Sequence, residues 1–456
     1  MTVTTAMAPP SARDPKRTFA ARAPLAACSL LAACALLLTA APRLGAQGEQ
    51  PPSGREADVR AGAARLLAPL PETLASLGEG AVIVYAVPAP EALHVFLATP
   101  QGRVARESRV KREELDALAS GFRGLLFDPA KDPRAAGKRL YDLLIRPLEP
   151  ELAQAGAKTL ALSLDGPLRL VPVAALWDGE KWLAERYAVS YVTEATFDKL
   201  RRDPPAGPPR AAAFGVSKAL GGFSAAPGVA DELSSAVKTP GSPEGALEGE
   251  IYLDGDFTRK ALSDGLASGA QAVHVATHYK TERGNGGDIS LLLGDGSYLS
   301  LKSFWTDPGF SLKNVDLLTL SFDAFGAAEA VRGPEESFLS ESLQKAGASA
   351  VLSAVFPVSD RSAPALMREF YRRRYVEGKS KAQALQEAQL AVMASSPAAS
   401  GGAGSEGAAP APPAGSPASG SPAGDGDEAQ GAAAWTGKGF SHPFHWAPYI
   451  LVGNWK

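Results

Sequence analysis

The strongest constraint on the fold is an alternation of short apolar runs with helical segments in the second half of the chain. The apolar runs span residues 210–217, 270–278, 289–295, 315–322 and 348–356. Helical patterns fit residues 335–346, 359–376 and 380–395, and Thr258 is placed to cap a further helix that ends near Gly269. Apolar strands separated by helices are typical of a parallel sheet that is covered on both faces. We therefore predict an α/β fold with a mostly parallel sheet.

The first half of the chain has its own strand and helix signals. We expect a hairpin from residues 81–87 and 92–99, helices at 111–127 and 134–155, a strand, turn and second strand within 158–176, and a strand at 187–192. The clearest internal boundary is residues 201–210, because their four prolines and one glycine cannot continue a helix or a central strand. The chain is thus predicted to contain two α/β halves.

The amino terminus has the pattern of an export signal. Basic residues precede an apolar run at 23–41, and Leu44 and Ala46 suit the small-residue rule for cleavage before Gln47. We expect residues 1–46 to be a signal peptide, which places the protein in the periplasm, the cell envelope or the extracellular space. An uncleaved membrane anchor through residues 23–41 and a bacterial lipoprotein signal, with "LAAC" ending at Cys28 and Cys34, are the alternatives.

Two further segments have compositions that do not suit a packed core. Residues 47–75 read as a polar linker followed by a short, proline-interrupted helix. Residues 396–438 are small, polar and rich in proline and glycine, so we expect a disordered loop there. The apolar stretch after this loop predicts a final strand, so the fold continues beyond it.

The cysteine content excludes several kinds of chemistry. Cys28 and Cys34 are the only cysteines, so a chain cleaved after Ala46 has no disulfide, thiolate metal site or cysteine nucleophile. The formal net charge of −3 would become −7 on cleavage, because residues 1–46 contain five basic residues and one acidic residue. This charge gives no reason to expect binding to nucleic acid or to an anionic membrane surface.

Candidate site residues follow two of the predicted strands. His278 ends the run 270–278, Asp323 directly follows the run 315–322, and Ser321 lies two residues before Asp323. Open parallel sheets place their chemistry at the carboxyl ends of strands, so these residues are expected to lie close together. His274 and His278 are four residues apart, but they lie in a strand and have no third ligand nearby. We predict no metal and no cofactor.

Several stretches, in order along the chain, resemble the CHAT domain, a family of caspase-like proteins. "LALSLDGPLRLVPVAALWDGEKWLAERYAVSYV" is similar to a strand and turn motif of the family, and "AVHVATHYK" resembles its "hfATHG" motif. "DLLTLSFDAFG" resembles "dLVvLSACeTg", and "HPFHWAPYILVGNW" is similar to the closing "hPyyWApFvLvG". The resemblance covers residues 76–456. It implies a caspase-like αβα sandwich with a degenerate first half at 76–205 and a second half at 206–456.

The resemblance also implies where a catalytic dyad would lie and how this chain departs from it. His278 matches the family's catalytic histidine, and Asp323 stands at the position of the catalytic cysteine. Tyr279 replaces a glycine beside the place where a substrate backbone would approach, and Asp360 lies where caspase-like folds build their primary specificity pocket. We expect an exported, catalytically inactive binding or scaffold module with a protein or peptide partner. A peptidase that uses His278 with Ser321, Asp323 or another non-cysteine nucleophile, and a structural protein of the cell envelope, are the alternatives.

Overall fold

The computed structural model describes residues 80–200, 207–282, 288–323, 334–396 and 433–456, together with positions 74, 75 and 78. These residues all belong to one compact unit, Pro52–Lys456. The predicted signal peptide, most of the linker at 47–75, residues 201–206 of the internal boundary and most of the loop at 396–438 lie outside the described residues. None of the helices in the described ranges is long and apolar enough to cross a membrane.

The described strands form one mixed sheet in which parallel pairs predominate. Their order is β10-β9-β8-β11-β12-β13-β5-β4-β1-β2-β3, and β6 pairs with both β8 and β7. The strands are β1 (Ala81–Pro88), β2 (Ala92–Thr99), β3 (Gly102–Arg109), β4 (Thr159–Leu164), β5 (Ala188–Tyr191), β6 (Arg210–Gly215), β7 (Glu248–Leu253), β8 (Ala272–Glu282), β9 (Asp288–Leu292), β10 (Tyr298–Ser300), β11 (Leu317–Asp323), β12 (Ala350–Ala354) and β13 (Tyr449–Gly453). The α/β class and the mostly parallel sheet are confirmed.

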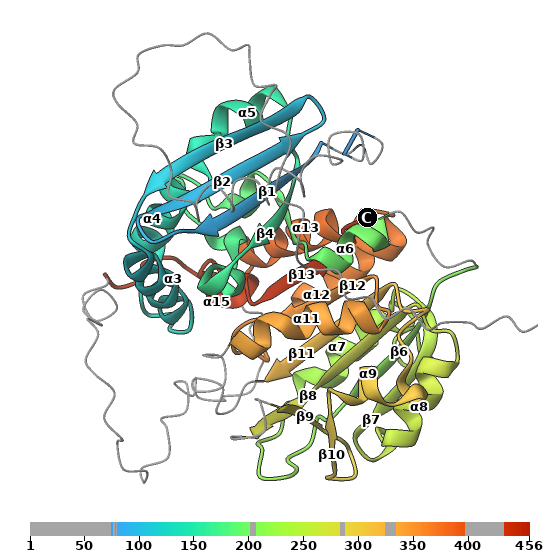
Figure 1. Cartoon of the computed structure of the whole chain (residues 1–456). Helices are drawn as coiled ribbons and strands as arrows, with labels where there is room; N and C mark the ends of the chain where they lie inside the picture. Colours follow the sequence, from blue (N-terminus) through green and yellow to red (C-terminus); the bar gives the residue numbers. More distant parts are fainter. Residues whose placement is uncertain are drawn as a thin grey trace, which may run out of the picture. The chain divides into compact units, whose positions relative to one another are not determined.

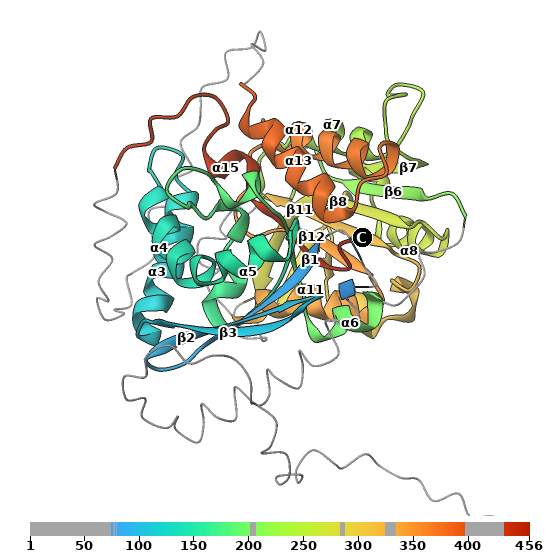
Figure 2. The same cartoon turned by 90° about the horizontal axis from the view of Figure 1, so that it is seen from above.

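Helices cover both faces of this sheet. They are α3 (Arg112–Leu126), α4 (Arg134–Leu144), α5 (Glu149–Gln154), α6 (Glu194–Leu200), α7 (Gly228–Ala236), α8 (Arg259–Ala267), α9 (Ser303–Thr306), α11 (Pro334–Ala346), α12 (Ala363–Tyr371), α13 (Lys381–Met393) and α15 (Pro443–Trp446). Figure 2 shows α12 and α13 on one side of the strands and α11 and α6 on the other. We call these sides the α12 face and the α11 face.

Side chains along the central strands alternate between two apolar clusters. Ala272 and Ala276 of β8 pack in the cluster that contains Leu366 of α12, whereas Val273 and Val275 pack in the cluster that contains Leu343 of α11. A strand that is apolar at every position is therefore buried on both faces, as its sequence predicted.

β13 joins the two halves of the sheet. It pairs antiparallel with β12 and parallel with β5, so the parallel strands of the first half run in the opposite direction to those of the second half. Figure 1 shows β13, in red, between the orange strands of the second half and the green and blue strands of the first. The carboxyl ends of β4 and β5 therefore lie at the opposite edge of the sheet from those of β8, β11 and β12.

Some predicted elements differ in the structure. The second strand expected within 158–176 is absent, because Pro167 and Pro172 interrupt the segment and it forms short 3₁₀ turns at 166–170 and 173–175. The helix expected at 359–376 starts at Ala363 and ends in a π-helical turn at 372–376. The strands β3 and β7 and the helix α7 were not predicted.

Residues 433–438, which the sequence analysis assigned to a disordered loop, instead lie against the first half. The Asp132 amide donates to the Ala433 carbonyl at 2.7 Å, and the Trp435 amide donates to the Ala130 carbonyl at 2.8 Å. The Arg134 guanidinium lies over the Trp435 ring at 5.0 Å from its centroid. These backbone and cation–π contacts order the end of a segment whose composition alone predicts disorder.

His442 connects this segment to α15 and creates a pH dependence. Its Nδ1 accepts from the Phe444 amide at 3.0 Å and its Nε2 donates to the Lys131 carbonyl at 3.0 Å. Burial of the ring, which is 1% exposed, lowers the pKa of His442 from 6.5 to about 4. Between these two values the unfolded chain binds a proton that the folded protein excludes, so stability falls as the pH is lowered through this window.

We expect the substitution His442→Asn to flatten this part of the pH profile. Asparagine also caps helices and donates to carbonyls, but it does not titrate. Going from pH 6.5 to pH 4.5, the wild-type protein should lose roughly 2–3 kcal/mol more free energy of unfolding than the variant, at 1.36 kcal/mol per pH unit. Urea unfolding at the two pH values measures this difference. Equal losses in both proteins would contradict the assigned buried neutral state of His442.

Candidate functional site

The pairing of β8 with β11 brings two predicted site residues together. The strands are parallel and in register from Leu317 opposite Ala272 to Asp323 opposite His278. Parallel pairing of β8 stops at His278, and from Tyr279 onward the strand pairs antiparallel with β9 instead. The prediction that β8 ends at His278 is therefore wrong, but His278 is the last residue of its parallel pairing, opposite the last residue of β11.

A loop that the sequence did not indicate holds His278. The imidazole is 1% exposed and stacks on the Phe223 ring at 4.6 Å between centroids. Its Nε2 lies 3.2 Å from the Ser224 carbonyl oxygen, which can only accept, so Nε2 carries a proton and donates it to this carbonyl. Asp254 anchors the start of the loop by accepting from the Ser217 amide at 2.8 Å and hydroxyl at 3.0 Å.

Ser321 occupies a position unsuited to a nucleophile. It lies inside β11, is 5% exposed, and its Oγ forms a 2.6 Å hydrogen bond with the Tyr449 hydroxyl of β13. Burial raises the pKa of Tyr449 well above its ordinary value, so this phenol stays protonated and does not act as a base for Ser321. The pair is a buried hydrogen bond between central strands.

Asp360 and Tyr279 lie in different places. Asp360 is in the exposed turn after β12 and lines a small cavity together with His278, Ser321 and Glu232. That cavity has a volume of about 20 Å³, which is room for about one water molecule. Tyr279 instead points to the α11 face, where it packs in the apolar cluster and lines a second, larger cavity. The expectation that Tyr279 lies beside His278 in one pocket is wrong, because successive side chains of a strand point to opposite faces.

One family model matches most of this chain. The family model of the CHAT domain matches residues 134–454. The chain belongs to the CHAT domain family. No curated protein matches it.

Solved structures of low sequence identity also match. The Arg-specific cysteine proteinase gingipain R is 11% identical, with a TM-score of 0.35 over 56% of this chain and 62% of the other. A complex of Porphyromonas gingivalis pro- and mature domains is also 11% identical, with a TM-score of 0.34 over 61% of this chain and 71% of the other. The Saccharomyces cerevisiae separase–securin complex is 10% identical, with a TM-score of 0.43 over 74% of this chain and 30% of the other. The chain therefore spans 62% and 30% of the gingipain R and separase chains respectively.

Beneath His278, the CHAT domain contains a buried polar chain that the sequence analysis missed. Thr319 of β11 lies 2.9 Å from the Tyr371 hydroxyl, which lies 3.0 Å from His274 Nδ1. His274 Nε2 in turn lies 3.0 Å from Glu232 Oε1 on α7. Since the carboxylate accepts from Nε2, the hydroxyls donate in sequence from Thr319 through Tyr371 to Nδ1. His274 is therefore a core residue, and its second nitrogen is not directed at a ligand.

A metal site is not assigned. Across the described ranges, no group of three or more histidine, cysteine, aspartate or glutamate side chains is arranged to hold an ion. The Nε2 atom of His274 is paired with Glu232 Oε1, and the Nε2 atom of His278 is paired with the Ser224 carbonyl. The Nε2 atom of each ring is thus engaged in positioning that ring.

Proposed function

We propose that this CHAT protein is an exported, non-catalytic module that binds a protein or peptide partner. The observation that carries the proposal is the residue opposite His278 at the end of β11, which is Asp323. A cysteine thiolate at such a position would be assisted by the imidazole and attack a carbonyl carbon. The chain has cysteines only at 28 and 34, within the predicted signal peptide.

The other groups near His278 support the same conclusion. A carboxylate is a weak, well-hydrated nucleophile toward amides, and its charge favours a protonated imidazole rather than a general base. The Ser321 hydroxyl is buried and bonded to Tyr449. The small cavity beside His278 is too small for an amino-acid side chain in this structure. Among the described residues, a strand-end position opposite His278 that holds Asp323 in place of a thiol supports a binding role rather than peptide cleavage.

Export is part of the proposal and rests on the leader. Basic residues followed by the apolar run at 23–41 and by small residues before Gln47 match a secretory signal. A mature chain without cysteine suits an oxidising compartment, since it has no thiol to be oxidised.

The change Asp323→Cys tests the proposal. We expect purified residues 47–456 to produce no new amino termini from a broad peptide pool, as read by mass spectrometry. The Asp323→Cys variant should produce them, because His278 and the Ser224 carbonyl already provide the setting for a thiolate. Activity should rise from background by at least about 100-fold, within the range that general base assistance contributes.

Two controls separate the possible outcomes. The double variant Asp323→Cys, His278→Ala should return to background if the restored thiol depends on the imidazole. Cleavage by the native protein that disappears in His278→Ala would overturn the non-catalytic assignment. Inactivity of Asp323→Cys would show that the rest of the site has diverged too, and would leave the binding function standing.

A further inference from the structure

The loop between β6 and α7 covers one face of the His278 imidazole. It leaves the carboxyl end of β6, which pairs in parallel with β8, so it lies at the strand ends where open parallel sheets place their sites. The Phe223 ring of this loop stacks on the imidazole with 4.6 Å between centroids and an interplanar angle of 9°. Phe223 is half-buried and His278 is 1% exposed, so the phenyl ring lies between the imidazole and solvent.

The backbone of this loop is held independently of the Phe223 ring. Leu220 and Phe223 exchange two backbone hydrogen bonds, of 3.3 and 3.0 Å, around Gly221 and Gly222. Both glycines have positive φ values, 62° and 89°, as a tight two-residue turn of this kind requires. Asp254 holds the start of the loop through its bonds to the Ser217 amide and hydroxyl. The phenyl ring can therefore rotate away from the imidazole while the backbone stays in place.

The geometry of the contact favours an aromatic group at this position. The hydrogen bond from His278 Nε2 to the Ser224 carbonyl lies in the plane of the imidazole, so it fixes the orientation of the ring without using its faces. A second flat ring that lies parallel to such a face makes more contacts with it than an aliphatic side chain does. The Phe223 ring thus shows which kind of side chain fits against His278.

We propose that the Phe223 ring occupies a binding position for an aromatic side chain of the partner. The partner is a protein or peptide segment that places a phenylalanine, tyrosine or tryptophan on the His278 imidazole when Phe223 rotates out. The bond from His278 to the Ser224 carbonyl stays in place, and Phe223 closes the position again when the partner leaves. The inference rests on the proposed function, because it names the chemistry of the partner that a non-catalytic domain would bind.

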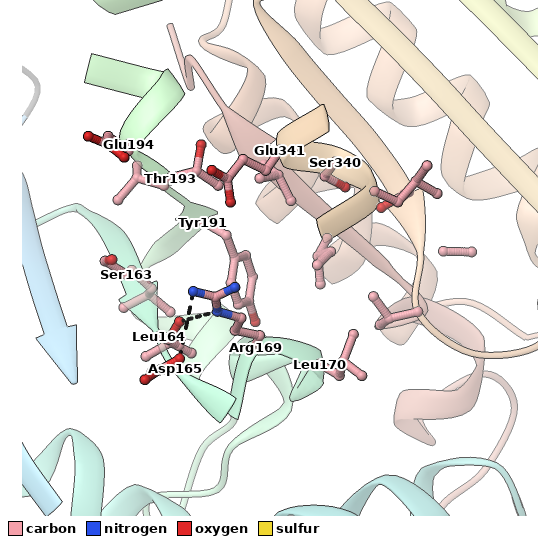
Figure 3. A pocket seen from close by; sticks show the side chains of 18 of the residues that line it. Ser163, Leu164, Asp165, Arg169, Leu170, Tyr191, Thr193, Glu194, Ser340 and Glu341 are labelled. Atoms are coloured by element: carbon pink, nitrogen blue, oxygen red, sulfur yellow. Dashed lines mark hydrogen bonds and ion pairs between the residues drawn. The ribbon is translucent and has the colours of Figure 1, made fainter. Parts of the chain in front are cut away.

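The larger cavity on the α11 face is a separate place on the molecule. It has a volume of about 390 Å³ and lies on the opposite side of the sheet from His278. Figure 3 shows Arg169 in its lining beside Asp165, and the two pair at 3.7 Å, so the charge of the guanidinium is balanced within the chain. A ligand in that cavity would lie behind the sheet, so the reactivity of His278 reports on the Phe223 position alone.

Reaction of His278 with diethyl pyrocarbonate tests the proposal. The chain has five histidines, so mass spectrometry of its proteolytic fragments gives a reaction rate for each of them. His278 should react slowly in the purified wild-type protein and at least about ten-fold faster in Phe223→Ala, because the ring that excludes the reagent is lost. Acetyl-Gly-Phe-Gly-amide at millimolar concentration should return the rate in the variant toward that of the wild-type protein. The same peptide with cyclohexylalanine or alanine in place of phenylalanine should protect much less.

Internal references and further variants exclude a general effect on folding. The other buried histidines should react slowly in every variant, and they are His94, His274 and His442. Phe444→Ala removes another half-buried phenylalanine, beside His445, and should leave the rate at His278 unchanged. Phe223→Leu keeps apolar bulk in the loop without a flat ring, so His278 should again react several-fold faster in this second variant.

Different outcomes overturn the inference and the proposed function. An unchanged rate at His278 in both Phe223 variants would show that the ring does not cover the imidazole. Failure of the phenylalanine peptide to protect His278, or equal protection by the cyclohexylalanine peptide, would overturn the assignment of an aromatic partner. The same spectra show whether the peptides are cleaved. Cleavage would overturn the proposed function, whereas intact peptides that do not protect His278 would overturn this inference alone.

Discussion

Replacing Glu232 by leucine is expected to lower the free energy of unfolding by about 3 kcal/mol. Glu232 is 3% exposed and is the final acceptor of the hydrogen-bonded chain from Thr319 through Tyr371 and His274. Leucine removes the charge-assisted hydrogen bond and leaves the buried His274 Nε2–H without an acceptor, and an unsatisfied buried donor costs about 1–3 kcal/mol. Urea unfolding at pH 7 measures the loss.

Glu232→Gln is the matched control for this prediction. Its side-chain oxygen keeps the acceptor for His274 at the same place, so we expect it to lose about 1 kcal/mol, less than half of the effect of leucine. A leucine variant within about 1 kcal/mol of the wild-type protein would show that the chain of hydrogen bonds contributes little. Tyr371 reports the same network independently, since Tyr371→Phe removes the donor to His274 Nδ1.

The substitution Gln344→Ala is expected to have an effect of similar size at the junction of the two halves. Gln344 is fully buried on α11 and accepts from the Thr193 hydroxyl at 2.6 Å, and its Nε2 lies 3.5 Å from the Val452 carbonyl of β13. Alanine leaves these groups without their partner and opens a cavity. Unsatisfied buried groups cost about 1–3 kcal/mol each, so we expect a total loss of about 4 kcal/mol in urea unfolding.

Two further variants divide this loss into its causes. Gln344→Met restores most of the volume without the hydrogen bonds, so it should recover only the cavity contribution, about 1–2 kcal/mol. Lys345, at the next position of the same helix, is mostly exposed, so Lys345→Ala should leave the free energy of unfolding nearly unchanged. A Gln344→Ala loss no greater than that of Lys345→Ala would contradict the role assigned to Gln344. Gly453 belongs to the same arrangement, since a Cβ there would lie 2.1 Å from Gln344 Nε2.

Sequence patterns predicted the central strands well and the outer strands poorly, for a physical reason. β11 and β12 are mostly apolar because helices cover both of their faces. β3, "GRVARESR", carries mostly polar or charged residues, and β7, "EGEIYL", is apolar in only half of its positions, because both form sheet edges with little apolar burial. Hydrogen bonds to a neighbouring strand stabilise β3 and β7. The sequence of one strand does not show which strand it pairs with, so these strands were not predicted.

The candidate site was predictable only as far as it depends on strand ends. His278 and Asp323 end two parallel-paired runs, and this was enough to predict that they lie opposite each other. Phe223 and Ser224 were not found, because they lie in an irregular loop that is separated from His278 by more than 50 residues in sequence. The cavity on the α11 face was missed for a similar reason, since its walls come from segments that are spread along the chain from β1 to β13.

The position of β13 sets an order of events during folding. This strand lies between β12 and β5, and Val452 pairs with both Val351 and Tyr191. Until residues 449–453 have left the ribosome, β5 and β12 each present an apolar strand edge without its neighbour. Each half therefore folds with one open edge. The pairing of β13 with β5 is slow, because it closes the long loop between Tyr191 and Val452. Open strand edges promote aggregation. The newly made domain therefore depends on chaperones or on rapid pairing of β13 to avoid it.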